Sequence, residues 1–360
     1  MTLPALATLA CRRADTASSG YAFIANQDGG GIAAIDLDIL AVAKHIPIEG
    51  ALSQVLASAT RPAVYALTPA SGTIHEIHTG TLKFARKVTP EAHVDQLLSG
   101  GSPGDPLLYA VSREAQSVAA IDPETFRVTW KLHLPEEPND FTMSGDGKTA
   151  AVSSPSGVRL VSLRERSLGE PLGRGNFGQI RFLNNGERLV AADLDRQQIS
   201  VYRVLNPRLI AHLPIGVRPE NLCFNSDGGQ LFVTGPGADT VVILYPFDLP
   251  EVAETILVGH GPAAMSASKK GLLFITNPTA GSVTVLHVGT HKVISVVPVG
   301  GDPGSVGITP DDQLALVLNR ESGNVAVLNI DGIQPNRSKS APLVTIIPVG
   351  ARPVSSAMHG

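Results

Sequence analysis

The sequence has little cysteine, few aromatic residues and no surplus of basic charge. Cys11 and Cys223 are its only cysteines, too few for a disulfide framework. Aromatic residues make up 4% and charged residues 17%, and the net charge is −4 with the two signs mixed. Phosphate backbones are bound by clustered Lys and Arg, so we expect no nucleic-acid partner. No apolar run reaches the roughly 18 residues of a membrane-spanning helix.

Glycine and proline are abundant, and they separate short apolar runs. The chain has 36 Gly and 27 Pro and is 43% hydrophobic, which is typical of a turn-rich, well-buried all-β protein. Between residues 301 and 330, Val306 and Ile308 alternate with small residues, and two further apolar runs (314–318 and 325–330) follow after turns. Period-two alternation and β-branched residues bounded by turn formers predict three short strands.

This unit recurs along the chain. An aliphatic residue opens the last of the three runs in each copy, at spacings of 40 to 44 residues: Ile32, Ile74, Val118, Val158, Ile199, Val241, Val283 and Val325. Periods of about 40–45 residues with four strands each are typical of propeller blades. We therefore predict an all-β, eight-bladed β-propeller of four-stranded antiparallel blades. Seven blades are the alternative, because blades two to four are less regular and leave room for a miscount.

The two ends of the repeat region complete each other. Residues 350–360 repeat the start of a blade and stop where its second strand would begin, whereas Tyr21–Asn26 reads as a second strand with no first strand before it. We expect the C-terminal strand to pair with this N-terminal segment, which closes the ring and removes exposed sheet edges. Residues 21–360 then form a single propeller domain.

Residues 1–20 lie outside the repeat and predict a signal-like or disordered tether. The apolar run from Leu3 to Ala10 ends in Leu9-Ala10-Cys11 and is followed by small polar residues. This resembles the end of a bacterial lipoprotein signal, so Cys11 is the candidate lipidation site. We expect an extracytoplasmic protein, periplasmic or at the cell surface, that Cys11 anchors to a membrane through lipid. The alternative is a cytosolic chain with an apolar start.

The most regular blades resemble the YVTN-type β-propeller repeat. Leu272–Asn277 is an apolar strand that ends in Ile-Thr-Asn, and a glycine loop and the Val-rich run 283–285 follow it. The asparagine recurs as Asn26 and Asn319, and we expect it to serve the scaffold by capping the backbone of the B–C loop or adopting a left-handed conformation. The resemblance implies a secreted or surface-layer-associated propeller. Similar propellers carry lactonase activity or hold d1-type haem, and the fold does not decide between these roles.

Candidate binding residues lie in two sets of loops. With strands A to D running from the innermost to the outermost, the D–A and B–C loops of a propeller share the face at which the channel mouth binds ligands. On the D–A side these residues are His260, Arg218, Arg352, Asp302, Asn139 and Glu220. The B–C loops add Asp28, Arg113, Asp195, Arg196, Asp239 and Arg320. Solvated loop residues are the simpler reading of each one, and His260 and the two arginines Arg218 and Arg352 are the preferred candidates.

No catalytic or metal-binding motif is present. The chain lacks a Gly-x-Ser-x-Gly elbow and a His-Glu-x-x-His pair, and His75 and His78 are three apart on an expected strand and so face opposite sides. We therefore expect a monomeric, non-catalytic binding scaffold whose ligand or protein partner, like any cofactor, is unknown. The alternatives are a lactonase-like hydrolase and a haem or electron-transfer accessory, for which His260 would be the axial ligand.

Overall fold

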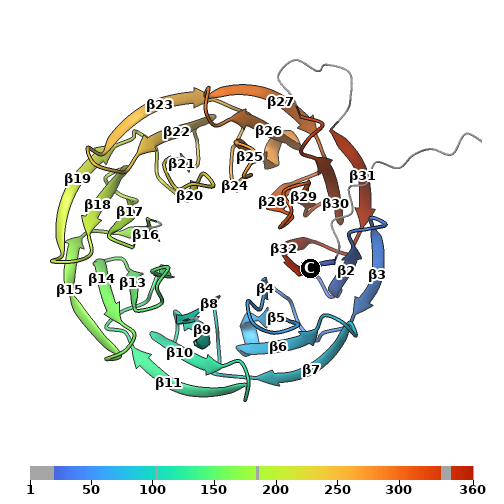
Figure 1. The fold of residues 1–360 in the computed structure, drawn as a ribbon, viewed down its shortest axis with the longest axis horizontal. Coiled ribbons are helices and arrows are strands. Elements are labelled where there is room, and N and C mark those ends of the chain that lie inside the picture. Colours follow the sequence, from blue (N-terminus) through green and yellow to red (C-terminus); the bar gives the residue numbers. More distant parts are fainter. Residues whose placement is uncertain (1–19, 103, 184–185, 334–341, 360) are drawn as a thin grey trace, which may run out of the picture.

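The computed structural model describes residues 20–102, 104–183, 186–333 and 342–359, and they form a ring of eight blades (Figure 1). Each blade is a four-stranded antiparallel sheet whose strands follow one another from the central axis to the rim of the ring. The prediction of eight blades is confirmed, and the alternative of seven is wrong. Each of the eight marker positions is the second residue of the third strand of its blade.

Each blade has four strands, which follow one another in order from the inside to the outside of the ring. Blades one to four comprise β32 (Pro353–His359), β1 (Tyr21–Asn26), β2 (Gly31–Asp36) and β3 (Ala41–Ile46); β4 (Gln54–Ala57), β5 (Ala63–Thr68), β6 (Thr73–His78) and β7 (Lys83–Val88); β8 (Gln96–Ser102), β9 (Asp105–Ser112), β10 (Ser117–Asp122) and β11 (Arg127–His133); and β12 (Asp140–Met143), β13 (Thr149–Ser153), β14 (Gly157–Ser162) and β15 (Ser167–Arg174).

Blades five to eight comprise β16 (Phe177–Phe182), β17 (Arg188–Asp193), β18 (Gln198–Arg203) and β19 (Arg208–Pro214); β20 (Asn221–Phe224), β21 (Leu231–Thr234), β22 (Thr240–Tyr245) and β23 (Glu251–Leu257); β24 (Met265–Ala267), β25 (Leu272–Asn277), β26 (Ser282–His287) and β27 (Lys292–Pro298); and β28 (Pro303–Ile308), β29 (Leu314–Asn319), β30 (Asn324–Asn329) and β31 (Leu343–Pro348). Two single-turn 3₁₀ helices, η1 (Pro69–Ser71) and η2 (Pro278–Ala280), lie in B–C loops.

The core lies between the blades. Eight clusters of buried apolar side chains occur in the described chain, and each is shared by two neighbouring blades. Strands B and C supply most of these side chains because both of their faces are covered; every residue of β29, for example, is buried. The outer strands alternate between exposed and half-buried residues, as in β11. Burial of apolar surface between sheets therefore holds the ring together.

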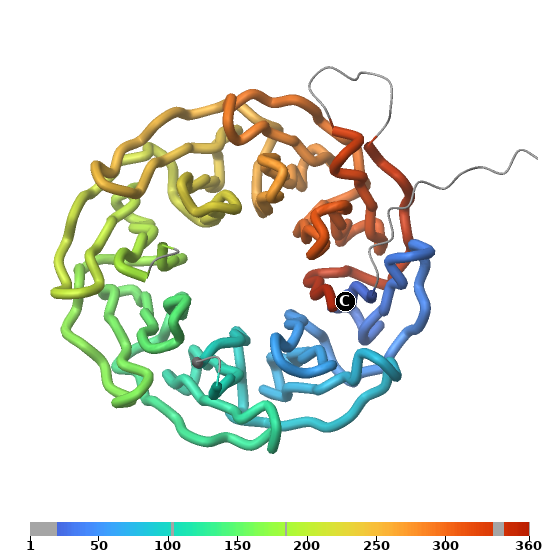
Figure 2. The backbone as a smooth tube through the Cα atoms, in the orientation of Figure 1, coloured from blue at the N-terminus to red at the C-terminus, as the bar shows by residue number. Residues whose placement is uncertain are grey.

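The ring closes as the sequence predicts. Strand β32 pairs antiparallel with β1, with Tyr21 opposite His359 and Phe23 opposite Ala357. The red C-terminal strand and the blue N-terminal blade lie side by side in Figure 2. Blade one is thus built from both ends of the described chain.

Every B strand ends in a buried polar residue. These residues are Asn26, Thr68, Ser112, Ser153, Asp193, Thr234, Asn277 and Asn319, and each is at most 4% exposed. The preserved feature is therefore a buried hydrogen-bonding group rather than asparagine.

The three asparagines serve the scaffold, but two of them hold the D–A loop that enters their blade rather than capping the backbone of the B–C loop. Asn26 Nδ2 donates to the carbonyl of Val349 at 3.0 Å, and Asn319 Nδ2 donates to that of Val299 at 2.9 Å. Asn277 Nδ2 instead donates to Thr284 Oγ1 at 2.9 Å. None of the three has a positive φ, so the expected left-handed conformation is wrong. These contacts position the D–A loops that carry the candidate site.

Cys223 is a free, half-buried thiol on β20, and Cys11 lies outside the described residues. Within the described part of the chain, no helix has the length and apolar character needed to cross a bilayer.

Candidate functional site: a charged pocket beside the ring closure

The D–A and B–C loops meet on one face, as expected. In blade one the amide of Gln27 donates to the carbonyl of Arg352 at 2.9 Å. In blade eight the amide of Arg320 donates to the carbonyl of Asp302, also at 2.9 Å. The same backbone hydrogen bond therefore sets the two loops of both blades, and it makes Gln27 the structural equivalent of Arg320 and Arg352 the equivalent of Asp302.

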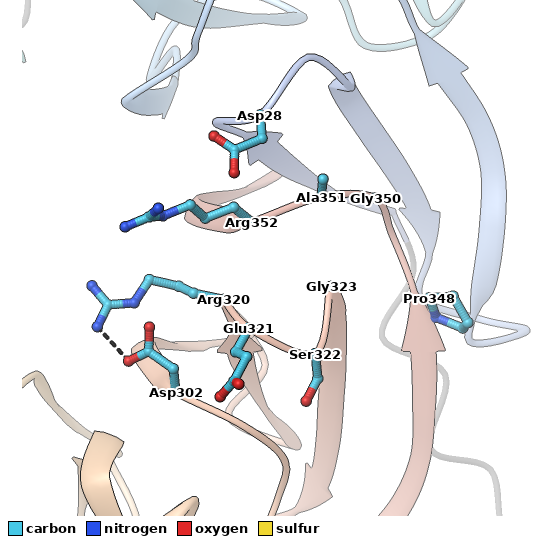
Figure 3. Close-up of a pocket in the computed structure, with 10 residues that line it drawn as sticks. All are labelled: Asp28, Asp302, Arg320, Glu321, Ser322, Gly323, Pro348, Gly350, Ala351 and Arg352. Carbon is cyan, nitrogen blue, oxygen red and sulfur yellow. Dashed lines mark hydrogen bonds and ion pairs between the residues drawn. The ribbon is translucent and has the colours of Figure 1, made fainter.

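A pocket of about 760 Å³ lies between these two pairs of loops. Its charged lining comes from two blades: Asp302, Arg320 and Glu321 belong to blade eight and its entry loop, whereas Asp28 and Arg352 belong to blade one. In Figure 3 the guanidinium groups of Arg320 and Arg352 extend side by side in the same direction, with Asp28 beside Arg352. The volume is in the range of small-molecule sites.

Arg320 is held in place by its neighbours. Its Nη2 donates to Asp302 Oδ1 at 2.5 Å, and its side chain crosses Gly304 on the inner strand β28. A Cβ at Gly304 would lie 2.6 Å from Arg320 Cδ and Nε, so only glycine permits this path. Nε of Arg320 is buried without a hydrogen-bond acceptor. Such a donor is costly to leave unpaired, which marks the pocket as polar and incompletely satisfied.

Arg352 has no carboxylate partner among the described residues. In blade eight the equivalent position, Asp302, is neutralised by Arg320, whereas in blade one the matching position on the B–C loop is Gln27, which is uncharged. The guanidinium of Arg352 is therefore free to bind a ligand. The other arginines of these loops, Arg113, Arg196, Arg218 and Arg320, each form an ion pair.

The two charged D–A residues of the pocket have a strained backbone. Asp302 and Arg352 both precede a proline and have φ values of 54° and 56°. The equivalent residue of blade seven is Gly261, with φ 67°. Glycine adopts this conformation without cost, whereas a charged residue there is strained and persists only where the surroundings impose it. Backbone strain thus coincides with the residues that line the pocket.

The six residues predicted on the D–A side do not form one site. Only Asp302 and Arg352 come together in this pocket, joined by Asp28 and Arg320 from the B–C set. Arg218 pairs with Glu220 at 3.4 Å and with Asp195 at 4.0 Å on another part of the face. Asn139 lines a second pocket of about 320 Å³ with Arg113, and its Nδ2 donates to the carbonyl of Phe177 at 2.8 Å.

His260 lies at the surface in an ion pair. Its Nδ1 is 3.0 Å from Asp239 Oδ2, and 68% of the His260 side chain is exposed. The hydrogen bond with His260, with a second from the Gly261 amide, lowers the pKa of Asp239 below its usual value. His260 lines neither the larger nor the smaller pocket, so the placement suits a solvated pair better than an axial ligand over a cofactor.

Sequence reasoning missed Glu321 and Ser322. Both line the larger pocket, and Ser322 Oγ accepts a hydrogen bond from the Gly301 amide at 2.7 Å. Their position directly after Arg320 is the signal that could have found them. Over the described ranges, no three His, Cys, Asp or Glu side chains are grouped so as to hold a metal ion.

The fold and the pocket define the class of this protein: an eight-bladed β-propeller with a charged pocket beside its closure. A family model described as "Lactonase, 7-bladed beta-propeller" matches residues 179–342, less than half of the chain. No curated protein matches this chain.

Solved structures resemble most or nearly all of the ring at low sequence identity. The dihydro-heme d1 dehydrogenase NirN, in complex with DHE, has a TM-score of 0.73 and 11% identity over 98% of this chain and 77% of its own. A proposed 6-phosphogluconolactonase from Bacteroides fragilis has a TM-score of 0.61 and 16% identity over 97% of this chain and 100% of its own. Hydrazine synthase from Kuenenia stuttgartiensis has a TM-score of 0.60 and 18% identity over 77% of this chain and 95% of its own. The chain is therefore a propeller with distant similarity to lactonase and d1-haem propellers, and the YVTN-type assignment stays a prediction.

Proposed function

We propose that the protein is an extracytoplasmic, non-catalytic binding propeller whose ligand is held in the pocket beside the ring closure. The observation that carries this proposal is the unneutralised guanidinium of Arg352 in a pocket that two blades build together. Arg352 has a strained backbone and its guanidinium has no ion-pair partner among the described residues, so it is suited to binding the charged group of a ligand.

The lining is suited to holding a ligand rather than to transforming it. Asp302 is committed to Arg320, and Ser322 Oγ is committed to the Gly301 amide. A nucleophile instead needs a side-chain base within hydrogen-bonding reach. The groups left for a ligand are Arg352, Asp28 and Glu321, which provide charge and orientation.

A thermal-shift screen tests the binding role. The panel is a set of sugars, organic acids and amino acids, measured with the wild type and with Arg352→Ala. We expect at least one compound to raise the Tm of the wild type and to lose that effect in the variant. Turnover of a sugar lactone by the purified wild type would overturn the non-catalytic role.

A lactonase-like hydrolase is the second candidate, because the family match spans residues 179–342 and includes Asp302, Arg320 and Glu321. In that case lactone hydrolysis would fall in Asp302→Asn and Glu321→Gln. A haem accessory is supported only by the likeness to NirN, and the exposed His260–Asp239 pair fits it poorly. Haem titration with the wild type and His260→Ala, followed by Soret absorbance, tests that alternative.

The extracytoplasmic location rests on Cys11 and the residues before it. Membrane fractionation after expression of the wild type and Cys11→Ser tests it. We expect the wild type in the membrane fraction and the variant in the soluble fraction, and an unchanged distribution would contradict the lipid anchor.

A further inference from the structure

The pocket beside the closure carries charges of both signs that have no internal partner. Asp28, Glu321 and Arg352 line it, and the charged group of each lacks a hydrogen bond or ion pair within the described chain. The remaining charged pair, Arg320 with Asp302, is neutral as a unit. One cationic and two anionic groups are thus available to a ligand.

The signs and positions of these groups select a ligand class. The pocket has two arginines and three carboxylates, so its lining has a net charge of 2 − 3 = −1. Figure 3 shows the two guanidinium groups side by side, with Asp28 on one side of them and Glu321 on the other, beyond Asp302. A simple anion would meet Arg352 but leave two carboxylates uncompensated, and a simple cation would leave Arg352 uncompensated.

We propose that this pocket binds a basic amino acid, a small molecule with one carboxylate and two cationic groups. The ligand carboxylate accepts hydrogen bonds from Arg352 and from the neighbouring guanidinium of Arg320. The α-ammonium and the side-chain cation pair with the carboxylates of Asp28 and Glu321. The inference rests on the proposed binding function and names its ligand class.

Whether the charge of Arg352 is neutralised depends on the residue at the B–C loop position beside it, which gives a direct way to block the site. In blade eight an acid and a base occupy the two loop positions and neutralise each other, as Asp302 and Arg320 do. In blade one the position that faces Arg352 is Gln27, joined to it by the same backbone hydrogen bond. A glutamate in place of Gln27 would form the missing ion pair and occupy Arg352, while every existing pocket residue remains.

The test uses the full chain and isothermal titration with L-lysine as the probe. Two analogues each lack one feature: norleucine has no side-chain ammonium, and cadaverine has no carboxylate. Glutarate, a dicarboxylate without ammonium groups, represents a simple anion. We expect L-lysine to bind, and each analogue to bind at least about tenfold more weakly, because charge-assisted hydrogen bonds are lost.

Variants locate the binding. Gln27→Glu and Arg352→Gln should each weaken L-lysine binding at least about tenfold, and Asp28→Asn should weaken it to a smaller extent. Arg113→Gln is the matched control, because Arg113 lies on the same face at the other pocket and pairs with Glu137 at 3.8 Å. It should leave L-lysine binding unchanged.

Each other outcome overturns the proposal in a distinct way. Binding of glutarate in preference to L-lysine, lost in Arg352→Gln, would overturn the basic amino acid but keep the pocket as a binding site. L-lysine binding that is indifferent to both Gln27→Glu and Arg352→Gln would place the ligand elsewhere. If none of the four probes binds the wild type, the ligand class is wrong, and the broader screen decides the binding role separately.

Discussion

The two halves of the ring hold their inner strands in different ways. From blade one to blade six, each inner strand is joined to the next by a polar side chain. These links are Val55 N to Ser355 Oγ, Gln54 to Leu97, Gln96 to Asp140, Asp140 to Arg181 and Ile180 N, and Leu222 N to Gln179 Oε1. From blade six through seven and eight to blade one, the inner strands are β20, β24, β28 and β32. Among their described residues no side-chain nitrogen or oxygen forms a hydrogen bond between neighbouring strands, and the thiol of Cys223 on β20 meets the backbone of Ala267 on β24.

The second half relies on asparagine and glycine instead. Asn277, Asn319 and Asn26 each contact the glycine of the D–A loop that enters their blade, and a Cβ on Gly259 would lie 2.3 Å from Asn277 Cγ. The asparagine–glycine contact involves one blade and the loop that enters it, so the same two residue types recur in blades seven, eight and one. A hydrogen bond between two inner strands instead requires complementary residues on two blades, so the residues differ from one interface to the next. The half that carries the regular repeat is also the half that carries the charged pocket.

Removal of Asp140 should have the largest effect on stability. Asp140 is 7% exposed, and its carboxylate accepts hydrogen bonds from Gln96 Nε2, Arg181 Nη1 and the Ile180 amide. Asp140→Ala removes the acceptor that these three donors share, and we expect it to lower the free energy of unfolding by about 2–3 kcal/mol, measured by urea denaturation.

Ser266→Ala on β24 is the control from the other half, with an expected change within about 0.5 kcal/mol. Equal losses in the two variants would contradict the distinction between linked and unlinked inner strands.

Overpacking of the asparagine–glycine contact should have the next largest effect. Gly259→Ala places a methyl group against Asn277, and we expect it to lower the free energy of unfolding by about 1–3 kcal/mol. Gly104→Ala is the control, because nothing lies within 4 Å of a Cβ there. In the double variant with Asn277→Ala the loss should be smaller than the sum of the single losses. Strict additivity would show that the two residues do not act as a unit.

Alkaline pH should destabilise the blades with linked inner strands (blades one to six) first, and this is the smallest of the three predicted effects on stability. Burial raises the pKa of Tyr65, Tyr109 and Tyr202, which lie in blades two, three and five, and it raises that of Tyr109 to about 12. The unfolded chain loses these protons near pH 10 while the folded chain keeps them, so stability falls as pH rises from about 10.

Urea denaturation across this range measures the loss, and Tyr109→Phe should make it shallower. Hydrogen exchange should then accelerate in blade three before blade eight. A pH dependence that Tyr109→Phe does not change would assign the loss to other groups.

The sequence predicted the fold well but the site only in part. Blade number, strand order and closure follow from periodic apolar residues such as Ile32 and Val325, because burial between sheets is a local requirement that each repeat meets in the same way. The loops were assigned to the correct face for the same reason. Asp302 and Arg352 were predicted as site residues and do meet in one pocket, whereas His260, Arg218, Glu220 and Asn139 lie apart from it.

The sequence by itself determined the ring, because hydrophobic period and turn residues are sufficient to specify repeated sheets. Only the tertiary structure decided which loop charges are neutralised. Arg218 and Arg352 occupy equivalent positions before a proline, yet Arg218 pairs with Glu220 and Asp195, whereas the B–C loop residue bonded to the backbone of Arg352 is the uncharged Gln27. Whether such an arginine forms an ion pair depends on the residue in the B–C loop beside it and on residues of the neighbouring blade. These residues are separated from the arginine by up to nearly the whole length of the chain.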